Sequence, residues 1–145
     1  MANQAIVWFD EGMLTAEQEA LRDAVRQMLD RGDASWTALC GIGVAGLGVA
    51  EDHGGAGTLA EAHVVLEELG RALAPVPMLS TVIATQALLG TDRAADLLPG
   101  IVDGTTTATV VWADSLTDVV PYVLDGDTAD VLVVSTPDGV FLGDT

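Results

Sequence analysis

Residues 58–77 read TLAEAHVVLEELGRALAPVP, and this stretch decides the fold of the chain. Thr58 can cap a helix N-terminus, and Glu61, three residues later, completes the pattern of a capping box. Apolar residues then recur at helical spacing and form one stripe: Leu59, Ala62, Val65, Leu66, Leu69, Ala72 and Leu73. Pro75 and Pro77 end the helix, because proline lacks the amide hydrogen that a further turn needs.

A glycine-rich segment, GLGVAEDHGGAG (Gly46–Gly57), comes directly before this helix. Its last four residues are expected to form a loop, because glycine loses much backbone entropy in a helix or strand. The overlapping segment Gly41–Gly46 fits the pattern GxGxxG of dinucleotide sites, which requires a strand before it and a helix after it. Here a helix capped by Ser35 precedes the pattern and more glycine follows, so we expect a helix end and an apolar turn.

Two further helices are predicted before the glycine-rich segment. Thr15 and Gln18 form a second capping-box pattern, and Gly32 is placed to end the helix that follows. The apolar stripe of that helix consists of Leu21, Val25, Met28 and Leu29. Ser35 is placed to cap a shorter helix over residues 36–44.

The segment that contains Pro75 and Pro77 has some features of a membrane-spanning helix. Residues 72–91 contain no charged side chain and have about the length of such a crossing. Their two prolines and several polar residues favour a buried helix instead, from about Met78 to Leu89 and apolar nearly all round. A last short helix is expected from a cap at Asp92 to Leu98.

The pattern changes to that of strands after residue 104. We expect four strands, at Thr105–Ala113, Val119–Leu124, Asp130–Thr136 and Gly139–Leu142. The dipeptides Asp125-Gly126 and Asp138-Gly139 are typical of hairpin turns. The fold class is therefore α+β. An all-α domain of about five helices at residues 1–104 precedes a short, incomplete β segment at residues 105–145, which must pack on the helices.

The charge balance limits the partners. The 145 residues include 22 acidic residues and five arginines, for a formal net charge of −17. Nucleic acid and anionic membranes need a basic surface, so neither is expected as a partner. The single cysteine, Cys40, excludes an internal disulfide and fits a reducing compartment. Residues 1–9 lack the basic start of a signal peptide, and we expect a cytoplasmic protein without a membrane span.

The sequence contains no complete catalytic or metal motif. The patterns GxSxG, the P-loop and HExxH are absent, so no catalytic residue and no metal ligand is predicted. His53 stands beside Glu51 and Asp52 and could bind a metal or act as a base. No further residue completes such a site, which favours a solvated loop. His63 lies off the apolar stripe and is expected at a surface or an interface.

Four segments resemble the N-terminal part of acyl-CoA dehydrogenases, in the order and spacing of that family. TAEQEALRDAVRQML (Thr15–Leu29) is similar to the family's first helix, and GVAGLGVAEDHGGAGT (Gly43–Thr58) resembles its glycine turn. EELGRALAPVPMLSTVIATQALL (Glu67–Leu89) resembles a helix and the pocket helix that follows it. LLPGIVDGTTTATVVW (Leu97–Trp112) resembles the crossing into the middle β domain, so the resemblance covers essentially the whole chain.

This resemblance implies that the complete enzyme uses FAD, an acyl-CoA substrate and an electron-transfer acceptor, and that it is a homo- or hetero-oligomer. It also implies which residues line the acyl pocket at the start of the helix after the prolines: Pro77, Met78, Thr81 and Val82. The family's catalytic glutamate lies in a C-terminal domain or close to it. Its flavin-contacting segment has no match in Trp112–Asp127, so we expect this chain alone to lack activity and not to hold FAD.

Three hypotheses follow. The chain is the N-terminal part of a flavin-dependent acyl-CoA dehydrogenase, or it is a degenerate, non-catalytic subunit that pairs with an active chain. The third hypothesis is a small acidic interaction domain without a ligand. The acyl chain length and the choice between fatty and steroid-type acyl groups stay open at this point.

Overall fold

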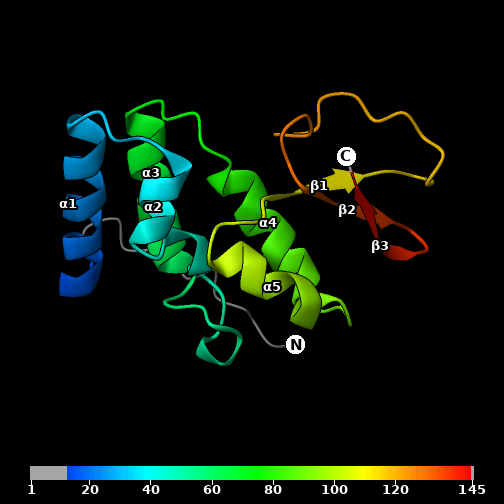
Figure 1. Cartoon of the computed structure of the whole chain (residues 1–145), viewed down its shortest axis with the longest axis horizontal. Helices are drawn as coiled ribbons and strands as arrows, with labels where there is room; N and C mark the ends of the chain where they lie inside the picture. Colours follow the sequence, from blue (N-terminus) through cyan, green and yellow to red (C-terminus); the bar gives the residue numbers. More distant parts are fainter. Residues whose placement is uncertain (1–12, 145) are drawn as a thin grey trace, which may run out of the picture.

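The computed structural model describes residues 13–144, so the segment tested as a signal peptide lies outside the described residues. Helices come first along the chain and strands last, which confirms the α+β class (Figure 1). The α-helices are α1 (Ala16–Asp30), α2 (Trp36–Gly41), α3 (Leu59–Arg71), α4 (Met78–Leu88) and α5 (Ala94–Val102). Two 3-10 turns lie at Val44–Gly46 and Glu51–His53. The strands are β1 (Ala108–Trp112), β2 (Val131–Thr136) and β3 (Gly139–Asp144).

Both predicted capping boxes are present. At α1, the Gln18 amide donates to the Thr15 hydroxyl at 3.2 Å, and the Thr15 amide donates to the Gln18 side chain at 3.1 Å. At α3, the Thr58 amide donates to the Glu61 carboxylate at 2.7 Å. These bonds satisfy amides that have no partner inside the helix, and they fix where each helix begins.

The first hydrophobic core joins α1, α2 and α3 to the start of α4. Its buried members are Val25, Leu29, Leu39, Val44, Leu47, Ala62, Val65, Leu69 and Met78. The centre of the predicted α3 stripe is therefore confirmed, but its two ends are not. Leu59, the first residue of α3, is 49% exposed. Leu73 is 86% exposed because the helix has ended at Arg71 and the backbone of Leu73 is left-handed.

The second core joins α4 and α5 to the sheet. Its buried members are Ala84, Leu88, Ile101, Ala108, Val110 and Val133. The strand order is β1-β2-β3, with β1 parallel to β2 and β2 antiparallel to β3. Figure 1 shows α4, with α5 alongside it, between helices α1–α3 and the sheet. This core includes residues on both sides of position 104, where the division into two domains was predicted; that division stays a prediction.

Residues 113–130 differ from the prediction. No strand forms at Val119–Leu124, and Asp125-Gly126 does not close a hairpin. The reason is the pairing of β1 with β2 in parallel, which requires a long connection instead of a tight turn. The connection is held where the Thr109 hydroxyl donates to the Leu124 carbonyl at 2.6 Å. The hairpin turn predicted at Asp138-Gly139 is confirmed by the antiparallel β2–β3 pair.

Two helix ends also differ from the prediction. Helix α2 stops at Gly41 and is followed by a 3-10 turn, so it does not continue to Val44 as one helix. Helix α5 runs through Pro99 to Val102 instead of ending at Leu98. Its N-cap residue is Arg93, which makes no capping hydrogen bond, so the predicted cap at Asp92 is wrong.

The glycine-rich segment folds as a compact loop between α2 and α3. A Cβ atom on Gly55 would overlap the backbone carbonyl of Val49, so the chain comes too close here for any other residue. The segment Gly41–Gly46 begins with the last residue of α2 and ends with the 3-10 turn at Val44–Gly46, as expected for a helix end and not for a dinucleotide motif. Within residues 13–144, no helix is long and apolar enough to cross a membrane.

Candidate functional site

Helix α4 carries the four residues predicted to line an acyl pocket. The structure buries Met78 and Thr81 completely within the chain, at 0% and 1% exposure, and leaves Pro77 and Val82 half-buried. The part of the helix open to the outside is instead formed by Leu79, at 47% exposure, and by other apolar residues of the same face. The predicted four are therefore neighbours along one helix, but they do not share one open surface.

The buried side of α4 is polar near its start. The Ser80 hydroxyl donates to the Asp125 carboxylate at 2.6 Å, and the Thr85 hydroxyl donates to the carbonyl of Thr81 at 2.7 Å. The Thr81 hydroxyl is buried and has no hydrogen-bond partner among the described residues. A buried hydroxyl without a partner is destabilising, typically by about 1–3 kcal/mol. Thr81 is thus one of three buried polar residues of α4, with Ser80 and Thr85, and the one whose hydroxyl has no partner among the described residues.

Glu68 is the most strongly held charged group in the described residues. It is 2% exposed and lies on α3 facing α1. Arg26 of α1 binds both of its carboxylate oxygens, with Nε 2.9 Å from Oε2, and the Arg71 Nε donates to Oε2 at 2.8 Å. The two guanidinium groups hold the pKa of Glu68 at about 2, well below its ordinary value of 4.5. Arg71 therefore pairs with Glu68, and not with Glu67 as the sequence spacing suggests.

Two further contacts join the same helices. Gln18 of α1 donates from Nε2 to the Glu61 carboxylate at 2.9 Å, and Arg71 reaches Asp30 at 3.1 Å. Hydrogen bonds from Thr58 and Gln18 lower the pKa of Glu61 to about 2. We call these contacts, together with those of Glu68, the α1–α3 clasp. The clasp joins the two parallel helices at both ends and so holds α1 against α3.

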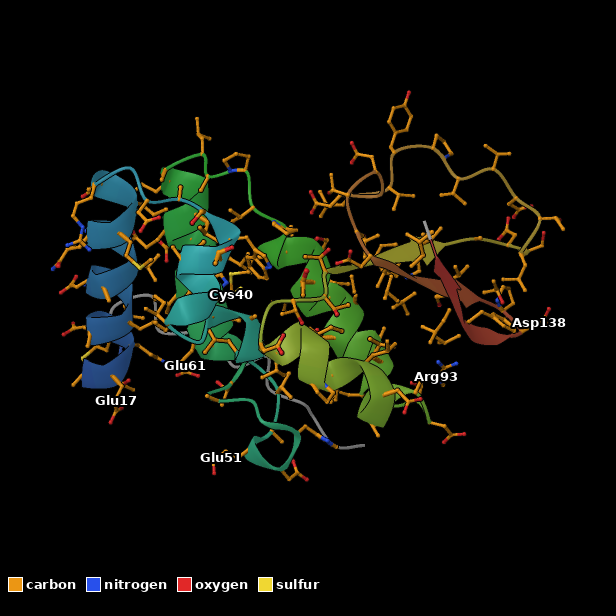
Figure 2. The ribbon with its side chains drawn as sticks, viewed as in Figure 1. Glu17, Cys40, Glu51, Glu61, Arg93 and Asp138 are labelled. Atoms are coloured by element: carbon orange, nitrogen blue, oxygen red, sulfur yellow. The ribbon has the colours of Figure 1, made fainter. Side chains whose placement is uncertain are left out.

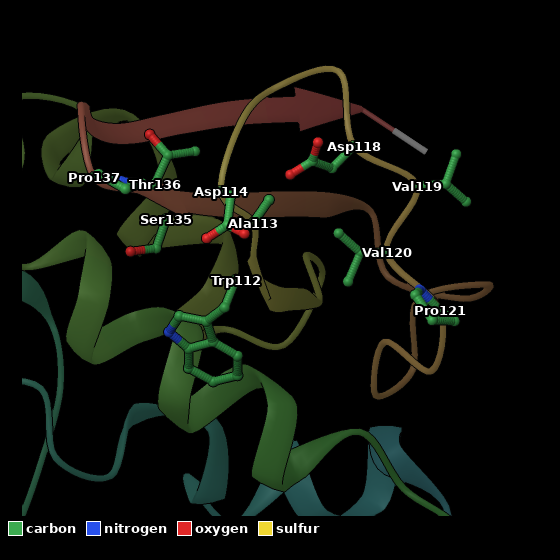
Figure 3. Close-up of a pocket in the computed structure, with 10 residues that line it drawn as sticks. All are labelled: Trp112, Ala113, Asp114, Asp118, Val119, Val120, Pro121, Ser135, Thr136 and Pro137. Carbon is green, nitrogen blue, oxygen red and sulfur yellow. The ribbon is translucent and has the colours of Figure 1, made fainter.

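A groove lies where the two parallel strands end, and we call it the strand-end groove. Its volume is about 600 Å³, and it is lined by Trp112, Ala113, Asp114, Asp118, Val119, Val120, Pro121, Ser135, Thr136 and Pro137. Figure 3 shows the first part of the 113–130 connection arching over the ends of β1 and β2, with Trp112 below Asp114 and Ser135. Trp112 and Ser135 are partners in the β1–β2 register, so they stand side by side.

The residues of the β segment do not fit a complete FAD. The pyrophosphate of FAD is an anion, and residues 105–145 contain no arginine, lysine or histidine that could neutralise it. The strand-end groove is instead lined by the carboxylates of Asp114 and Asp118. All five arginines belong to α1, to α3 or to the ends of these helices and of α5.

The histidines do not complete a site. His53, Glu51 and Asp52 are exposed on a 3-10 turn, as expected for a solvated loop, and Figure 2 shows Glu51 at the outer edge of the molecule. His63 is exposed on α3. Within residues 13–144 no three metal-ligating side chains gather. Burial raises the pKa of the half-buried Cys40 thiol, which makes it a poor nucleophile.

Sequence reasoning missed Glu68 and the strand-end groove. A signal for Glu68 was present, since this acid stands between Val65 and Leu69 of the apolar stripe and so had to be buried or to interrupt it. No local signal indicated the groove, because Trp112 and Ser135 become neighbours only through the parallel pairing of β1 and β2.

Comparisons with known proteins extend this picture. The family model for the acyl-CoA dehydrogenase N-terminal domain matches residues 30–105. Acyl-CoA dehydrogenase IpdE2 of Mycolicibacterium smegmatis is 43% identical over 99 residues, which are 67% of this chain and 32% of that protein. Acyl-CoA dehydrogenase FadE28 of Mycobacterium tuberculosis is 39% identical over 95 residues, 62% of this chain and 28% of that protein. The chain thus spans about a third of the length of the curated relatives it matches.

Solved structures give the same result. A variant of the Tcur3481-Tcur3483 steroid ACAD matches with a TM-score of 0.76 and 31% identity, over 88% of this chain and 48% of that chain. The ChsE4-ChsE5 complex of Mycobacterium tuberculosis matches with a TM-score of 0.67 and 23% identity, over 91% of this chain and 48% of that chain, and shows the fold alone. The chain belongs to the acyl-CoA dehydrogenase family, of which it contains the N-terminal helical domain and the start of the β domain.

Proposed function

We propose that this chain is the N-terminal part of a flavin-dependent enzyme that removes hydrogens from Cα and Cβ of an acyl-CoA thioester. The observation that carries the proposal is the match of residues 30–105 to the family's N-terminal domain. The predicted order of helical domain and β segment, divided near residue 104, agrees with this role. FAD, the catalytic base and the electron acceptor's docking site belong, in this proposal, to parts of the enzyme outside these residues.

In this proposal the chain contributes a wall of the acyl pocket. Helix α4 suits that task because it has no charged side chain and is packed between the two cores. Pro77 and Val82 are only half-buried and can contact an acyl group directly. Met78 and Thr81 are buried and support the wall by packing behind it. The α1–α3 clasp makes the wall rigid, which keeps the apolar surface preorganised for its substrate.

A steroid-type acyl group is the substrate class we propose. The support is the 31% identity to a solved steroid ACAD over 88% of this chain. An acyl-CoA with a polycyclic tail needs a broad apolar wall, and α4 offers Leu79 and Ile83 at its open face.

A second candidate is a non-catalytic subunit that pairs with an active chain to form a heteromer. The observation that favours it is the absence of any cationic side chain from residues 105–145, where the family's flavin contacts would begin. Both candidates need a second polypeptide region to complete the site, and they differ in whether that region is covalently joined to this one.

A chimera tests the proposal. Residues 30–105 of this chain replace the matching segment of IpdE2 from Mycolicibacterium smegmatis, and flavin content and acyl-CoA-dependent dye reduction are measured beside unaltered IpdE2. We expect a yellow, active chimera whose activity falls when Val82→Trp fills the wall. Glu67→Ala, an exposed change on α3, serves as the matched control and is expected to change neither readout.

A chimera that holds flavin but reduces no dye with any acyl-CoA would contradict the proposed catalytic role and favour the non-catalytic subunit. Unchanged activity and substrate preference in the Val82→Trp chimera would contradict the acyl-wall assignment alone.

A further inference from the structure

The strand-end groove combines three groups that are free to bind. Trp112 is 65% exposed, although it ends the strand whose earlier residues form the second core. The Asp114 carboxylate and the Ser135 hydroxyl line the groove beside it and make no hydrogen bond with the described residues. An exposed indole beside an exposed carboxylate and a hydroxyl offers a ligand one flat apolar face and two hydrogen-bond acceptors.

The charge of the groove restricts what can bind. Asp118, on the arching connection, accepts hydrogen bonds from the Ser115 amide at 2.8 Å and from its hydroxyl at 3.0 Å, and so stays ionised in the groove wall. Residues 105–145 hold no cationic side chain that could neutralise Asp114 or Asp118. Anionic ligands are therefore repelled, and a cation is attracted.

Among cations, a guanidinium fits these groups best. Its flat face stacks on an indole, and its edge offers parallel N–H donors to a carboxylate. A lysine ammonium has no flat face and is more strongly hydrated, so it gains less from the same surface. The Ser135 hydroxyl can accept a further N–H at the edge of the groove.

The rim of the groove indicates that the guanidinium comes from a polypeptide. Val119 lines the groove and is 94% exposed, and Leu116 of the same connection is 59% exposed. Large apolar side chains around a charged pocket are typical of protein interfaces, in which tryptophan, tyrosine and arginine contribute most of the binding energy. A free small cation would leave this apolar rim uncovered.

Two hydrogen bonds anchor the 113–130 connection near the end that leads into β2. Ser80 of α4 binds Asp125, and Thr109 of β1 binds the Leu124 carbonyl, each at 2.6 Å. Both bonds lie directly after Tyr122 in the chain. A connection held in this way loses less conformational entropy on binding than a free loop would.

We propose that the strand-end groove is a docking site for an arginine side chain of a partner polypeptide, which stacks on Trp112 and pairs with Asp114. Val119 covers an apolar residue next to that arginine. The proposal stands on the groove itself and does not depend on the acyl-CoA dehydrogenase reaction.

The test is a nuclear magnetic resonance titration of the full chain labelled with nitrogen-15. The probe is the peptide acetyl-Leu-Arg-Leu-amide, and the reference peptides carry citrulline or lysine in place of arginine. The Trp112 indole signal is assigned with Trp112→Phe. We expect saturable shifts of the Trp112 indole and the Ser135 amide, with binding about tenfold weaker for the citrulline peptide, which lacks the charge.

Variants separate the docking site from general charge attraction. Asp114→Asn is expected to weaken binding of the arginine peptide about tenfold. Asp127→Asn removes the same charge from the same connection, but Asp127 does not line the groove, so binding is expected to stay unchanged.

Four results would overturn the proposal. The first is equal binding of the arginine and citrulline peptides, and the second is equal loss of binding in Asp114→Asn and Asp127→Asn. The third is no shift of Trp112 at about 10 mM arginine peptide, a concentration that detects even millimolar affinity. A Trp112 shift caused by FAD but not by the arginine peptide would also overturn it, and would assign the groove to the flavin.

Discussion

The helical part of the chain up to residue 104, which we call the frame, and the β segment after it differ in how their acidic side chains are neutralised. In the frame, the buried Glu68 lies between two arginines, and Glu61 accepts hydrogen bonds from Thr58 and Gln18. In the β segment, acidic side chains meet no cation, and Asp114 stays unpaired beside an exposed indole. The difference shows that the buried charge of the frame is neutralised within the chain, whereas acidic side chains of the β segment such as Asp114 are open to solvent or to a partner.

The largest expected effect comes from breaking the α1–α3 clasp. Glu68→Ala removes the buried carboxylate that two half-exposed arginines share and is expected to destabilise the chain by about 3 kcal/mol. Urea unfolding followed by circular dichroism measures this loss. Glu67→Ala, one position away but exposed, is the matched control and is expected to change stability little. Equal effects of the two changes would refute the role given to the clasp.

Acid should act on the frame through the same carboxylate. The folded-state pKa of Glu68 is about 2 and its ordinary value is 4.5, so its contribution is fully present above pH 4.5 and is lost as the pH falls toward 2. That contribution amounts to about 3 kcal/mol. The free energy of unfolding is measured at several pH values between about pH 6 and pH 2. It should fall less steeply with decreasing pH in Glu68→Gln than in the unaltered chain. Parallel curves for the two proteins would contradict this account.

The sequence predicted the local features of the frame and missed the features that depend on distant partners. Both capping boxes were predictable because each joins residues three positions apart, as Thr58 and Glu61 show. The Arg26–Glu68 pair joins positions 42 apart, and only the packing of α1 on α3 brings the two together. For the same reason Asp125-Gly126 was mistaken for a hairpin turn: the dipeptide permits a turn, but the choice of strand partner is not local.

The exposure of the four predicted acyl-pocket residues could not be predicted from the sequence, for a similar reason. The existence of α4 and its position after the prolines could be predicted, because Pro75 and Pro77 end one helix and the apolar run begins another. Which of its sides remains open depends on the neighbours of the helix. Met78 and Thr81 became buried against the two cores, whereas Leu79 and Ile83 did not.

A substitution in the glycine-rich loop gives the next smaller effect. Gly55→Ala places a Cβ atom against the Val49 carbonyl and is expected to destabilise the frame by about 1–3 kcal/mol. Gly70→Ala is the control, since Gly70 lies on α3 with no atom near its missing Cβ. This control should gain about 0.5–1 kcal/mol, because alanine favours the helix. Thermal unfolding distinguishes the two signs, and a neutral Gly55→Ala would refute the close approach.

The smallest expected effect concerns the link between the frame and the β segment. Ser80→Ala removes the bond to Asp125 and is expected to cost about 1–2 kcal/mol. Hydrogen exchange should then speed up around residues 124–126 and leave α1 and α3 unchanged. Thr117→Ala, on the same connection but bonded only to Ser115, is the control and should leave the exchange pattern unaltered. Faster exchange throughout the frame would show that the two regions are not separable in this way.

The central claim is that this chain forms the helical frame of an acyl-CoA dehydrogenase whose flavin is held by other parts of the enzyme. The most direct test is the visible absorption spectrum of the purified chain after incubation with excess FAD and gel filtration. We predict a folded, colourless protein, because no cation in residues 105–145 can meet the FAD pyrophosphate. A flavin band that elutes with the protein would contradict this claim and would place a cofactor site within the chain itself.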